Sequence, residues 1–176
     1  MEILVIGSEG FIGSHCIDYF TQKGDAVAGL DIFESSSKKY AYTKISRLSP
    51  ELDDVFEKKK FDVVINAAGS GNVSYSMTHP LIDFEANVLD TMKILDALRR
   101  YQPNVKYIHF SSAAVYGNPV LLPIQETAAS KPLSPYGWHK LISEQLCKEY
   151  TSLFKIKTAI LRPFSLKTGG EWLFLF

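Results

Sequence analysis

The sequence predicts an α/β fold built on a doubly wound parallel sheet. Short runs rich in β-branched residues alternate with longer amphipathic stretches, which is the pattern expected when crossover helices join parallel strands. The candidate strands are almost continuously apolar, which predicts burial on both faces of the sheet. A chain of 176 residues can form one core of this kind.

The expected elements alternate along the chain. Strands are predicted at residues 2–6, 26–31, 41–45, 63–66, 105–111 and 157–162, and helices at residues 11–23, 50–59, 80–101 and 135–154. The segment 40–48 carries mixed polar residues without clear alternation. In the helix at 80–101, spacings of three and four predict an apolar stripe, formed by Phe84, Val88, Met92, Leu95 and Leu98.

Composition excludes several classes of function. The 19 acidic residues balance the 19 basic residues, so no overall field would attract nucleic acid or an anionic membrane. No stretch approaches the roughly 20 apolar residues of a membrane span, and the first apolar run is too short for a signal peptide. Cys16 and Cys147 lie far apart without metal-ligand spacing, which favours reduced thiols and no metal site. We therefore expect a soluble, cytoplasmic protein.

The first predicted strand runs into a glycine-rich turn that opens a helix. Gly7, Gly10 and Gly13 place backbone N–H groups where an anion could approach, and the helix N-terminus adds about half a positive charge. The first glycine spacing is one residue longer than in the simplest dinucleotide fingerprint. The turn therefore predicts pyrophosphate binding, with close packing of strand against helix as the alternative.

Asp31 ends the second predicted strand about 20 residues after the turn, where an acidic side chain can accept hydrogen bonds from the adenosine ribose. A 2′-phosphate would place a second anion beside this carboxylate, so the sequence favours NAD over NADP. Lys38 and Lys39 could relieve that repulsion. The alternative is that Asp31 is only a turn residue at the end of a strand.

A second group of polar residues follows later in the chain. Ser134 and Pro135 suit the N-cap and first position of a helix, on which Tyr136 and Lys140 share one face. A lysine ammonium near the phenol would lower the pKa of Tyr136 from about 10 toward 7. Ser112 stands at the carboxyl end of a predicted strand, the edge at which open α/β sheets bind ligands. An exposed helix pair is the alternative for Tyr136 and Lys140.

The motifs occur in a characteristic order: the glycine turn, Asp31, Asn66-Ala67-Ala68-Gly69, Ser111-Ser112-Ala113-Ala114-Val115-Tyr116-Gly117 and Tyr136-Gly137-Trp138-His139-Lys140. Over residues 1 to about 164 the chain resembles the extended short-chain dehydrogenases of the NAD-dependent epimerase/dehydratase family, the group of UDP-glucose 4-epimerase and the sugar-nucleotide dehydratases. The resemblance implies a Rossmann-type fold and an NAD cofactor. It also implies a nucleoside-diphosphate sugar substrate and transient hydride transfer at its C4 position.

The resemblance also implies roles for single residues. Tyr136 would be the acid/base, Lys140 would lower its pKa and hold the nicotinamide ribose, and Ser112 would bond the reacting sugar oxygen. The remaining residues implied at the cofactor are Gly7, Gly10, Phe11, Ile12 and Gly13 at the pyrophosphate, Ala67, Ala68, Gly69 and Asn87 along the dinucleotide, and Pro163 and Phe164, after Arg162, beside the nicotinamide.

Two stretches depart from the family pattern. No aspartate follows the third strand, where Lys44-Ile45-Ser46-Arg47-Leu48 stands, so the adenine contacts are open. After Phe164 the sequence no longer resembles the family. We expect an NAD-binding domain at 1–165 and an atypical tail at 166–176, with the substrate lobe largely missing.

The alternatives concern both activity and assembly. Dehydratases carry an Asp-Glu pair where this chain has Ala113-Ala114, which favours an epimerase. The other candidates are an NAD(P)-dependent reductase or dehydrogenase of the same fold and an inactive dinucleotide-binding fragment. The helices at 80–101 and 135–154 resemble the surfaces that pair in family dimers, which makes them the candidate interface of a homodimer. The alternative is that the apolar stripe only covers the sheet.

Overall fold

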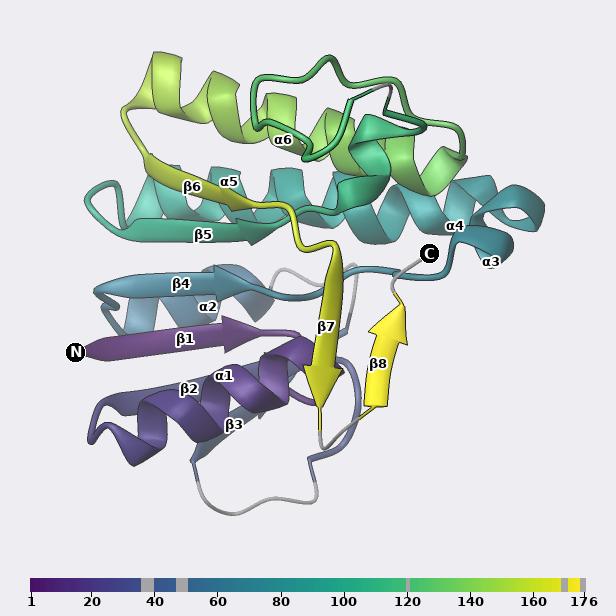
Figure 1. Cartoon of the computed structure of the whole chain (residues 1–176). Coiled ribbons are helices and arrows are strands. Elements are labelled where there is room, and N and C mark those ends of the chain that lie inside the picture. The colour runs from purple at the N-terminus through teal and green to yellow at the C-terminus, as the bar shows by residue number, and fades with distance from the viewer. Residues whose placement is uncertain (36–39, 47–50, 120, 169–170, 175–176) are drawn as a thin grey trace.

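The structure is a computed structural model that describes every residue except 36–39, 47–50, 120, 169–170 and 175–176. Six parallel strands form one sheet in the order β3-β2-β1-β4-β5-β6 (Figure 1). They are β1 (Glu2–Ile6), β2 (Ala26–Asp31), β3 (Ala41–Lys44), β4 (Val63–Asn66), β5 (Lys106–Phe110) and β6 (Lys157–Leu161). The predicted doubly wound parallel sheet is confirmed, and its order is that of the Rossmann fold.

Helices cover the two faces of the sheet unequally (Figure 1). One face carries α1 (Phe11–Gln22), and the other carries α2 (Glu51–Lys58), α5 (Asp90–Tyr101) and α6 (Pro135–Phe154). Successive side chains of a strand point to opposite faces. Accordingly Leu4 and Ile6 of β1 join the core beneath α2, α5 and α6, whereas Ile3 and Val5 join a smaller core with Ile17 of α1.

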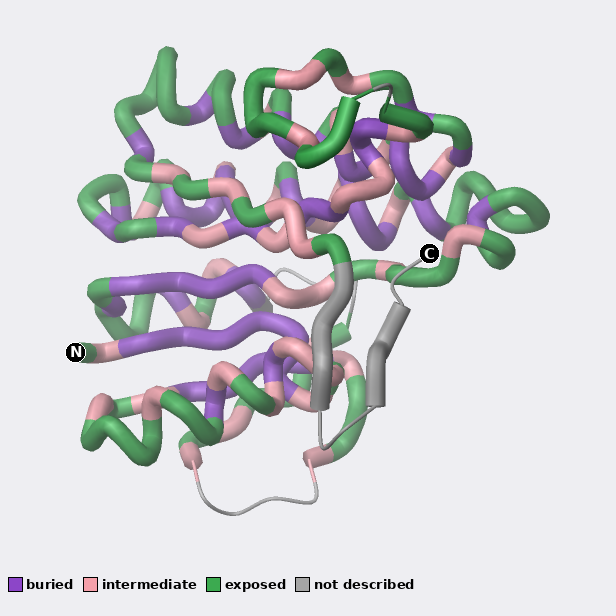
Figure 2. The backbone as a smooth tube through the Cα atoms, viewed as in Figure 1, coloured by how far each residue is buried: buried purple, intermediate pink, exposed green. Residues whose placement is uncertain are grey.

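Burial on both faces is confirmed for the central strands β1 and β4, whose apolar side chains are at most 9% exposed from Ile3 onward (Figure 2). It is wrong for β6, where exposed and half-buried residues alternate and Leu161 is 45% exposed. The cause is position in the sheet: β6 is an edge strand with α6 on one side, and no described helix covers its other side.

The helix predicted at 80–101 is interrupted. It consists of α4 (Pro80–Phe84), a π-helical turn η1 (Glu85–Leu89) and α5. Val88, Leu95 and Leu98 are buried, but Phe84 and Met92 of the predicted stripe are 37% and 46% exposed. The wider π turn changes the angular positions of the residues on either side, so one regular stripe does not form.

Four short elements were not predicted. These are α3 (Val73–Thr78), the 3₁₀ turn η2 (Ala113–Tyr116), and the antiparallel strands β7 (Ser165–Thr168) and β8 (Glu171–Phe174). The last two fall in the segment where we expected an atypical tail. Both cysteines are free thiols. Among the described residues, no helix combines the length and apolar character that a membrane crossing needs.

Candidate functional site

The glycine turn joins β1 to α1. Gly10 is the N-cap of α1, and Phe11, Ile12 and Gly13 form its first turn, where backbone N–H groups have no acceptor within the helix. A Cβ at Gly13 would lie 2.0 Å from the carbonyl oxygen of Gly7, so only glycine allows the helix to pack this closely on the turn. The close packing of strand against helix is therefore confirmed, and it brings the helix N-terminus and its partial positive charge to the turn. Pyrophosphate binding at the turn stays a prediction.

A cavity of about 200 Å³ lies at the carboxyl ends of β1 and β4, where the strand order reverses. Ligands of open α/β sheets bind at this crevice. The cavity brings together six of the predicted cofactor residues, Gly7, Gly10, Asp31, Ala67, Ala68 and Gly69. Residues that the sequence analysis did not select complete the lining: Ile6, Glu9, Leu30, Ile32, Phe33, Ile45, Ser46, Leu52, Ala86, Asp90, Lys93 and Ile94.

Asp31 ends β2 and is 8% exposed. Its carboxylate accepts hydrogen bonds from the backbone N–H groups of Glu9 (2.9 Å) and Ile32 (2.7 Å). It therefore holds the glycine turn in place as a turn residue would, and it also lines the cavity. The backbone N–H of Phe33 donates a third hydrogen bond to this carboxylate (3.3 Å). A carboxylate has about four acceptor positions, so capacity for about one ribose hydroxyl remains.

At the end of β3, Ile45 and Ser46 line the cavity, whereas Lys44 forms an ion pair with Glu34. No aspartate contributes to this part of the lining. Arg47, Leu48, Lys38 and Lys39 lie outside the described residues.

The turn after β4 connects the cavity to the second polar group. The Asn66 side chain accepts from Ala68 N (3.1 Å) and fixes the turn. Gly69 has φ +126°, and a Cβ there would lie 2.5 Å from Asn87 Oδ1 and 3.4 Å from Lys140 Nζ. Gly69 thus leaves the far end of the cavity open toward both side chains.

Asn87 lies in the π-helical turn, a feature frequent at functional sites. Its amide donates to Asp83 O (3.1 Å), while its Oδ1 atom is buried without a hydrogen-bond partner among the described residues. A buried acceptor without a partner is costly. The oxygen is suited to accept a hydrogen bond from a ligand that enters beside Gly69.

Helix α6 begins as predicted. The Ser134 hydroxyl accepts from Gly137 N (3.1 Å), and Pro135 is the first helical residue. Tyr136 and Lys140 follow one turn apart and are only 3% and 5% exposed, so they are not an exposed helix pair. The unpredicted helix α3 supports this end, because Ser76 Oγ accepts from Tyr136 N (3.1 Å).

Three side chains meet at the end of β5. Lys140 Nζ donates to Phe110 O (3.0 Å) and lies 6.0 Å from the centroid of the Tyr136 ring. Ser112 is buried, accepts from Ala114 N (3.1 Å), and hydrogen-bonds the Tyr136 phenol. The predicted catalytic residues Ser112, Tyr136 and Lys140 are thus brought together from two elements.

The pKa of Tyr136 differs from the one that the sequence predicted. Burial raises the pKa of Tyr136, the hydrogen bond from Ser112 lowers it, and the charge of Asp83 raises it further. The expected lowering toward 7 is therefore wrong for the chain by itself, because desolvation outweighs its neighbours. Burial lowers the pKa of Lys140 to about 8, against the opposing effect of Asp83.

The segment after β6 borders Ser112 and does not line the cavity. Pro163 O accepts from Ala113 N (3.0 Å), and the Phe164 ring stacks on Tyr116 with centroids 6.0 Å apart. Phe164 is 50% exposed. Within the described residues, these two therefore lie on the Ser112 side of the site.

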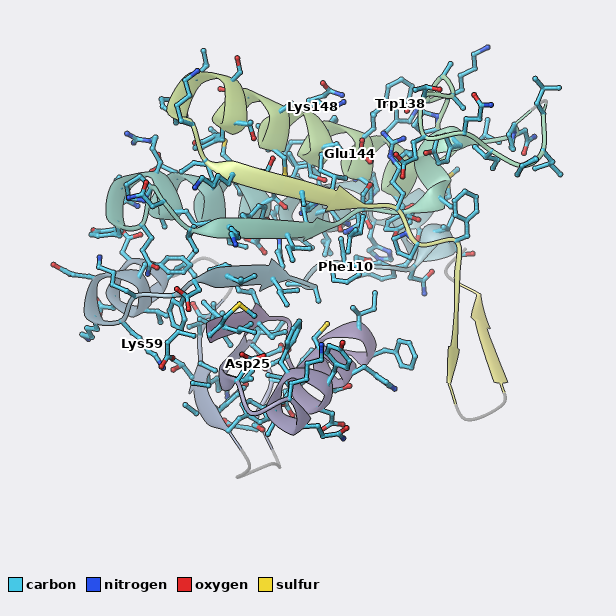
Figure 3. All side chains as sticks on the ribbon, turned by 60° about the vertical axis from the view of Figure 1, so that its left-hand side comes forward. Asp25, Lys59, Phe110, Trp138, Glu144 and Lys148 are labelled. Atoms are coloured by element: carbon cyan, nitrogen blue, oxygen red, sulfur yellow. The ribbon has the colours of Figure 1, made fainter. Side chains whose placement is uncertain are left out.

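Two buried polar contacts between side chains were not predicted. Glu144 of α6 is fully buried, and its carboxylate accepts from Ser111 Oγ (2.6 Å) and from Arg162 Nε (2.7 Å) and Nη2 (2.6 Å). Figure 3 shows Glu144 on α6 and Phe110 at the end of β5. His139 Nδ1 lies 2.6 Å from Asp83 Oδ2. The sequence offered one sign of the Glu144 contact. Tyr136, Lys140 and Glu144 follow one another at intervals of four residues, which places Glu144 on the same face of α6 as the other two.

Comparisons with known proteins agree with this geometry. The sequence profile of the NAD dependent epimerase/dehydratase family matches residues 3–168. The chain is 37% identical over 165 residues to a putative UDP-glucose 4-epimerase of Methanocaldococcus jannaschii, covering 91% of this chain and 54% of the relative. It is 35% identical over 175 residues to the UDP-glucose 4-epimerase of Streptococcus mutans, covering 94% and 52%.

Solved structures show the same likeness. The UDP-glucose 4-epimerase of Brucella ovis in complex with NAD superimposes with a TM-score of 0.87 at 32% identity, covering 92% of this chain and 51% of that one. A UDP-glucuronic acid 4-epimerase of Bacillus cereus in complex with UDP-glucuronic acid and NAD superimposes with a TM-score of 0.81 at 29% identity, covering 92% and 56%. The chain spans about half the length of the curated relatives it matches.

Proposed function

We propose, because the chain belongs to the NAD dependent epimerase/dehydratase family, that it binds NAD and acts in the 4-epimerisation of a nucleoside-diphosphate sugar. The observation that carries the proposal is the convergence of Ser112, Tyr136 and Lys140 next to the cavity at the glycine turn: Gly69 lines that cavity, and a Cβ at Gly69 would lie 3.4 Å from Lys140 Nζ. The two relatives and the two structures compared above are named as 4-epimerases of UDP-sugars.

The described residues fit the proposed cofactor. The cavity extends from Asp31, suited to ribose hydroxyls, past the glycine turn and on to Gly69. The free acceptor of Asn87 lies at that end. We propose Gly7, Gly10, Phe11, Ile12 and Gly13 as the pyrophosphate site, Ala67, Ala68, Gly69 and Asn87 as contacts along the dinucleotide, and Pro163 and Phe164 as its border near Ser112.

In the proposed mechanism, bound NAD would supply the acceptor and later the donor of the sugar's C4 hydride. Tyr136 exchanges a proton with the C4 hydroxyl. Ser112 hydrogen-bonds the phenol and favours its ionised form. Lys140 is mostly protonated below a pKa of about 8 and would orient the nicotinamide ribose. The burial of Tyr136 means that further positive charge in the loaded site would be needed to ionise it near neutral pH.

An epimerase is favoured over a dehydratase because Ala113 and Ala114 stand where dehydratases carry an acidic pair. A reductase or dehydrogenase of the same fold would release its cofactor in each cycle, so a dinucleotide that copurifies with the chain would count against it. A dinucleotide-binding chain without catalysis is the remaining alternative.

We also propose a homodimer and a cytoplasmic location. Leu81, Phe84 and Met92 of α4 and α5, with Trp138 and Ile142 of α6, are exposed apolar side chains on neighbouring helices, and Trp138 is labelled in Figure 3. Exposed apolar groups of this kind mark interaction surfaces. The free thiols of Cys16 and Cys147 suit a reducing compartment.

Calorimetric titration tests the proposal directly. The purified chain is titrated with NAD, NADH and NADPH, and then with UDP-glucose in the presence of the tightest dinucleotide. We expect NAD or NADH to bind. A sample that is folded by circular dichroism but binds no dinucleotide would overturn the proposal. Dinucleotide binding without UDP-glucose binding would withdraw this substrate and favour the non-catalytic alternative.

A further inference from the structure

The glycine turn carries an acidic residue that the proposed function does not use. Glu9 lines the cavity between Gly7 and Gly10, and its backbone N–H donates to Asp31 Oδ2 (2.9 Å). The phenol of Tyr40 donates a hydrogen bond to the Glu9 carboxylate. The turn and the end of β2 thus bring two acidic residues to the same end of the cavity.

The Tyr40 side chain is held in place from several sides. A Cβ at Gly29 of β2 would lie 2.3 Å from the Tyr40 ring and 2.6 Å from Ser8 Oγ, so the ring crosses β2 where no side chain blocks it. Tyr40 also packs against the core beneath α1. Burial and the hydrogen bond to Glu9 raise the pKa of Tyr40, so the phenol keeps its proton at neutral pH and remains a donor.

The charges around this end of the cavity are mainly negative. Burial, followed by the charges of Asp31 and Glu9, raises the pKa of Tyr42 to about 12, so both carboxylates act on one neighbouring phenol. Lys44 pairs in register with Asp31 on the adjacent strand, but its ammonium is engaged by Glu34. Among the described residues that line the cavity, Glu9, Asp31 and Asp90 carry carboxylates and Lys93 carries an ammonium, so negative charges outnumber positive ones.

We propose that Glu9, held by Tyr40, is a second specificity-determining residue that acts with Asp31 to exclude a 2′-phosphate and select NAD over NADP. A ribose hydroxyl can donate a hydrogen bond to a carboxylate, whereas a phosphate brings only acceptors and negative charge. Repulsion between like charges persists in a partly buried site. The inference rests on the proposed function, because it requires the cavity to hold a dinucleotide.

Fluorescence titration with NADH and NADPH tests the inference at low ionic strength. The Glu9→Gln variant removes the charge but keeps the size and an acceptor for Tyr40. We expect it to bind NADPH about tenfold more tightly, since removing one nearby like charge is worth about that much, with little change for NADH. Tyr40→Phe should shift the ratio in the same direction but less. Glu149→Gln, which removes one exposed charge on α6, is the matched control and should change neither affinity.

The outcomes separate this inference from the proposed function. Equal changes for NADH and NADPH in Glu9→Gln, or an unchanged ratio, would overturn the role of Glu9 while leaving dinucleotide binding intact. A folded wild-type chain that binds neither dinucleotide would overturn the proposed function itself, and the inference with it. Added salt should narrow the wild-type difference between the two cofactors, because salt screens the repulsion.

Discussion

At the scale of single residues, burial controls the ionisation of the groups around α6. Desolvation raises the pKa of Tyr136, lowers that of Lys140 to about 8 and lowers that of His109 to about 3. Each shift favours the neutral form, as expected when water is excluded. Burial therefore disfavours charge on all three side chains in the folded chain.

Replacing Tyr136 with Phe tests its proposed role. We expect Tyr136→Phe to abolish transfer of hydride between a UDP-sugar and bound NAD, because the only buried phenol bonded to Ser112 in the described site is lost. Dinucleotide affinity should stay within a few-fold. The measurement is absorbance of reduced cofactor after UDP-glucose is added, with Tyr19→Phe, an exposed tyrosine of α1, as the control. Equal hydride transfer in Tyr136→Phe and wild type would remove Tyr136 from the mechanism.

Because His109 is buried, we expect the free energy of unfolding of the chain to fall in acid. The unfolded chain takes up a proton at His109 near pH 6.5, whereas burial and the charge of Lys140 hold the pKa of the folded residue at about 3. The unfolded state therefore binds more protons between these values, and the free energy of unfolding falls as pH falls through this window, by roughly 2 kcal/mol between pH 6.5 and 5.

Urea unfolding at several pH values checks this prediction. His109→Gln keeps a donor for Ser143 Oγ, which lies 3.0 Å from His109 Nε2, and should lose this part of the acid sensitivity. His15→Gln, at an exposed position on α1, should retain it. If the free energy of unfolding fell with pH equally in wild type and in His109→Gln, His109 would not be the source of the acid sensitivity.

At the scale of elements, α6 presents one face to the end of the sheet through residues four apart. Tyr136, Lys140 and Glu144 are all buried there. Glu144 holds Arg162 just beyond β6 and Ser111 just beyond β5, next to Ser112. One side chain of α6 therefore ties together the two strand ends that border the proposed catalytic residues.

Breaking the ion pair between Glu144 and Arg162 should lower the stability of the folded chain. Arg162→Met leaves the fully buried Glu144 carboxylate without its cation, and we expect a loss of about 3 kcal/mol in the free energy of unfolding. Urea denaturation measures the loss. The double variant Glu144→Met with Arg162→Met should recover much of it, because it leaves no unpaired charge. A loss below about 1 kcal/mol, as for exposed ion pairs, would show that water solvates Glu144 after all.

At the scale of the whole molecule, the sheet has one face covered by α2, α5 and α6 and another on which α1 covers only part (Figures 1 and 2). The outer surface of α4, α5 and α6 carries exposed apolar side chains. It is the surface on which we propose that two copies associate.

A change of charge on this surface tests the dimer. We expect the wild-type chain to sediment as a dimer and the double variant Met92→Glu with Ile142→Glu to sediment as a monomer, because buried carboxylates without partners oppose association. Tyr19→Glu, at an exposed position on α1, should leave the mass unchanged. A wild-type chain that is monomeric at all accessible concentrations would contradict the proposed dimer.

The sequence by itself determined the fold class, all six strand positions of the parallel sheet to within about a residue of either end, and the family, because hydrophobic periodicity and motif order are local properties. It also predicted Ser112, Tyr136 and Lys140 as one group, since one helical turn and one strand end bring them together. Only the tertiary structure decided how these groups are ionised, since the pKa of Tyr136 depends on what buries it. The contacts of Glu9 with Tyr40 and of Glu144 with Arg162 were likewise beyond sequence patterns, because they join residues 31 and 18 positions apart whose meeting depends on how the sheet is assembled.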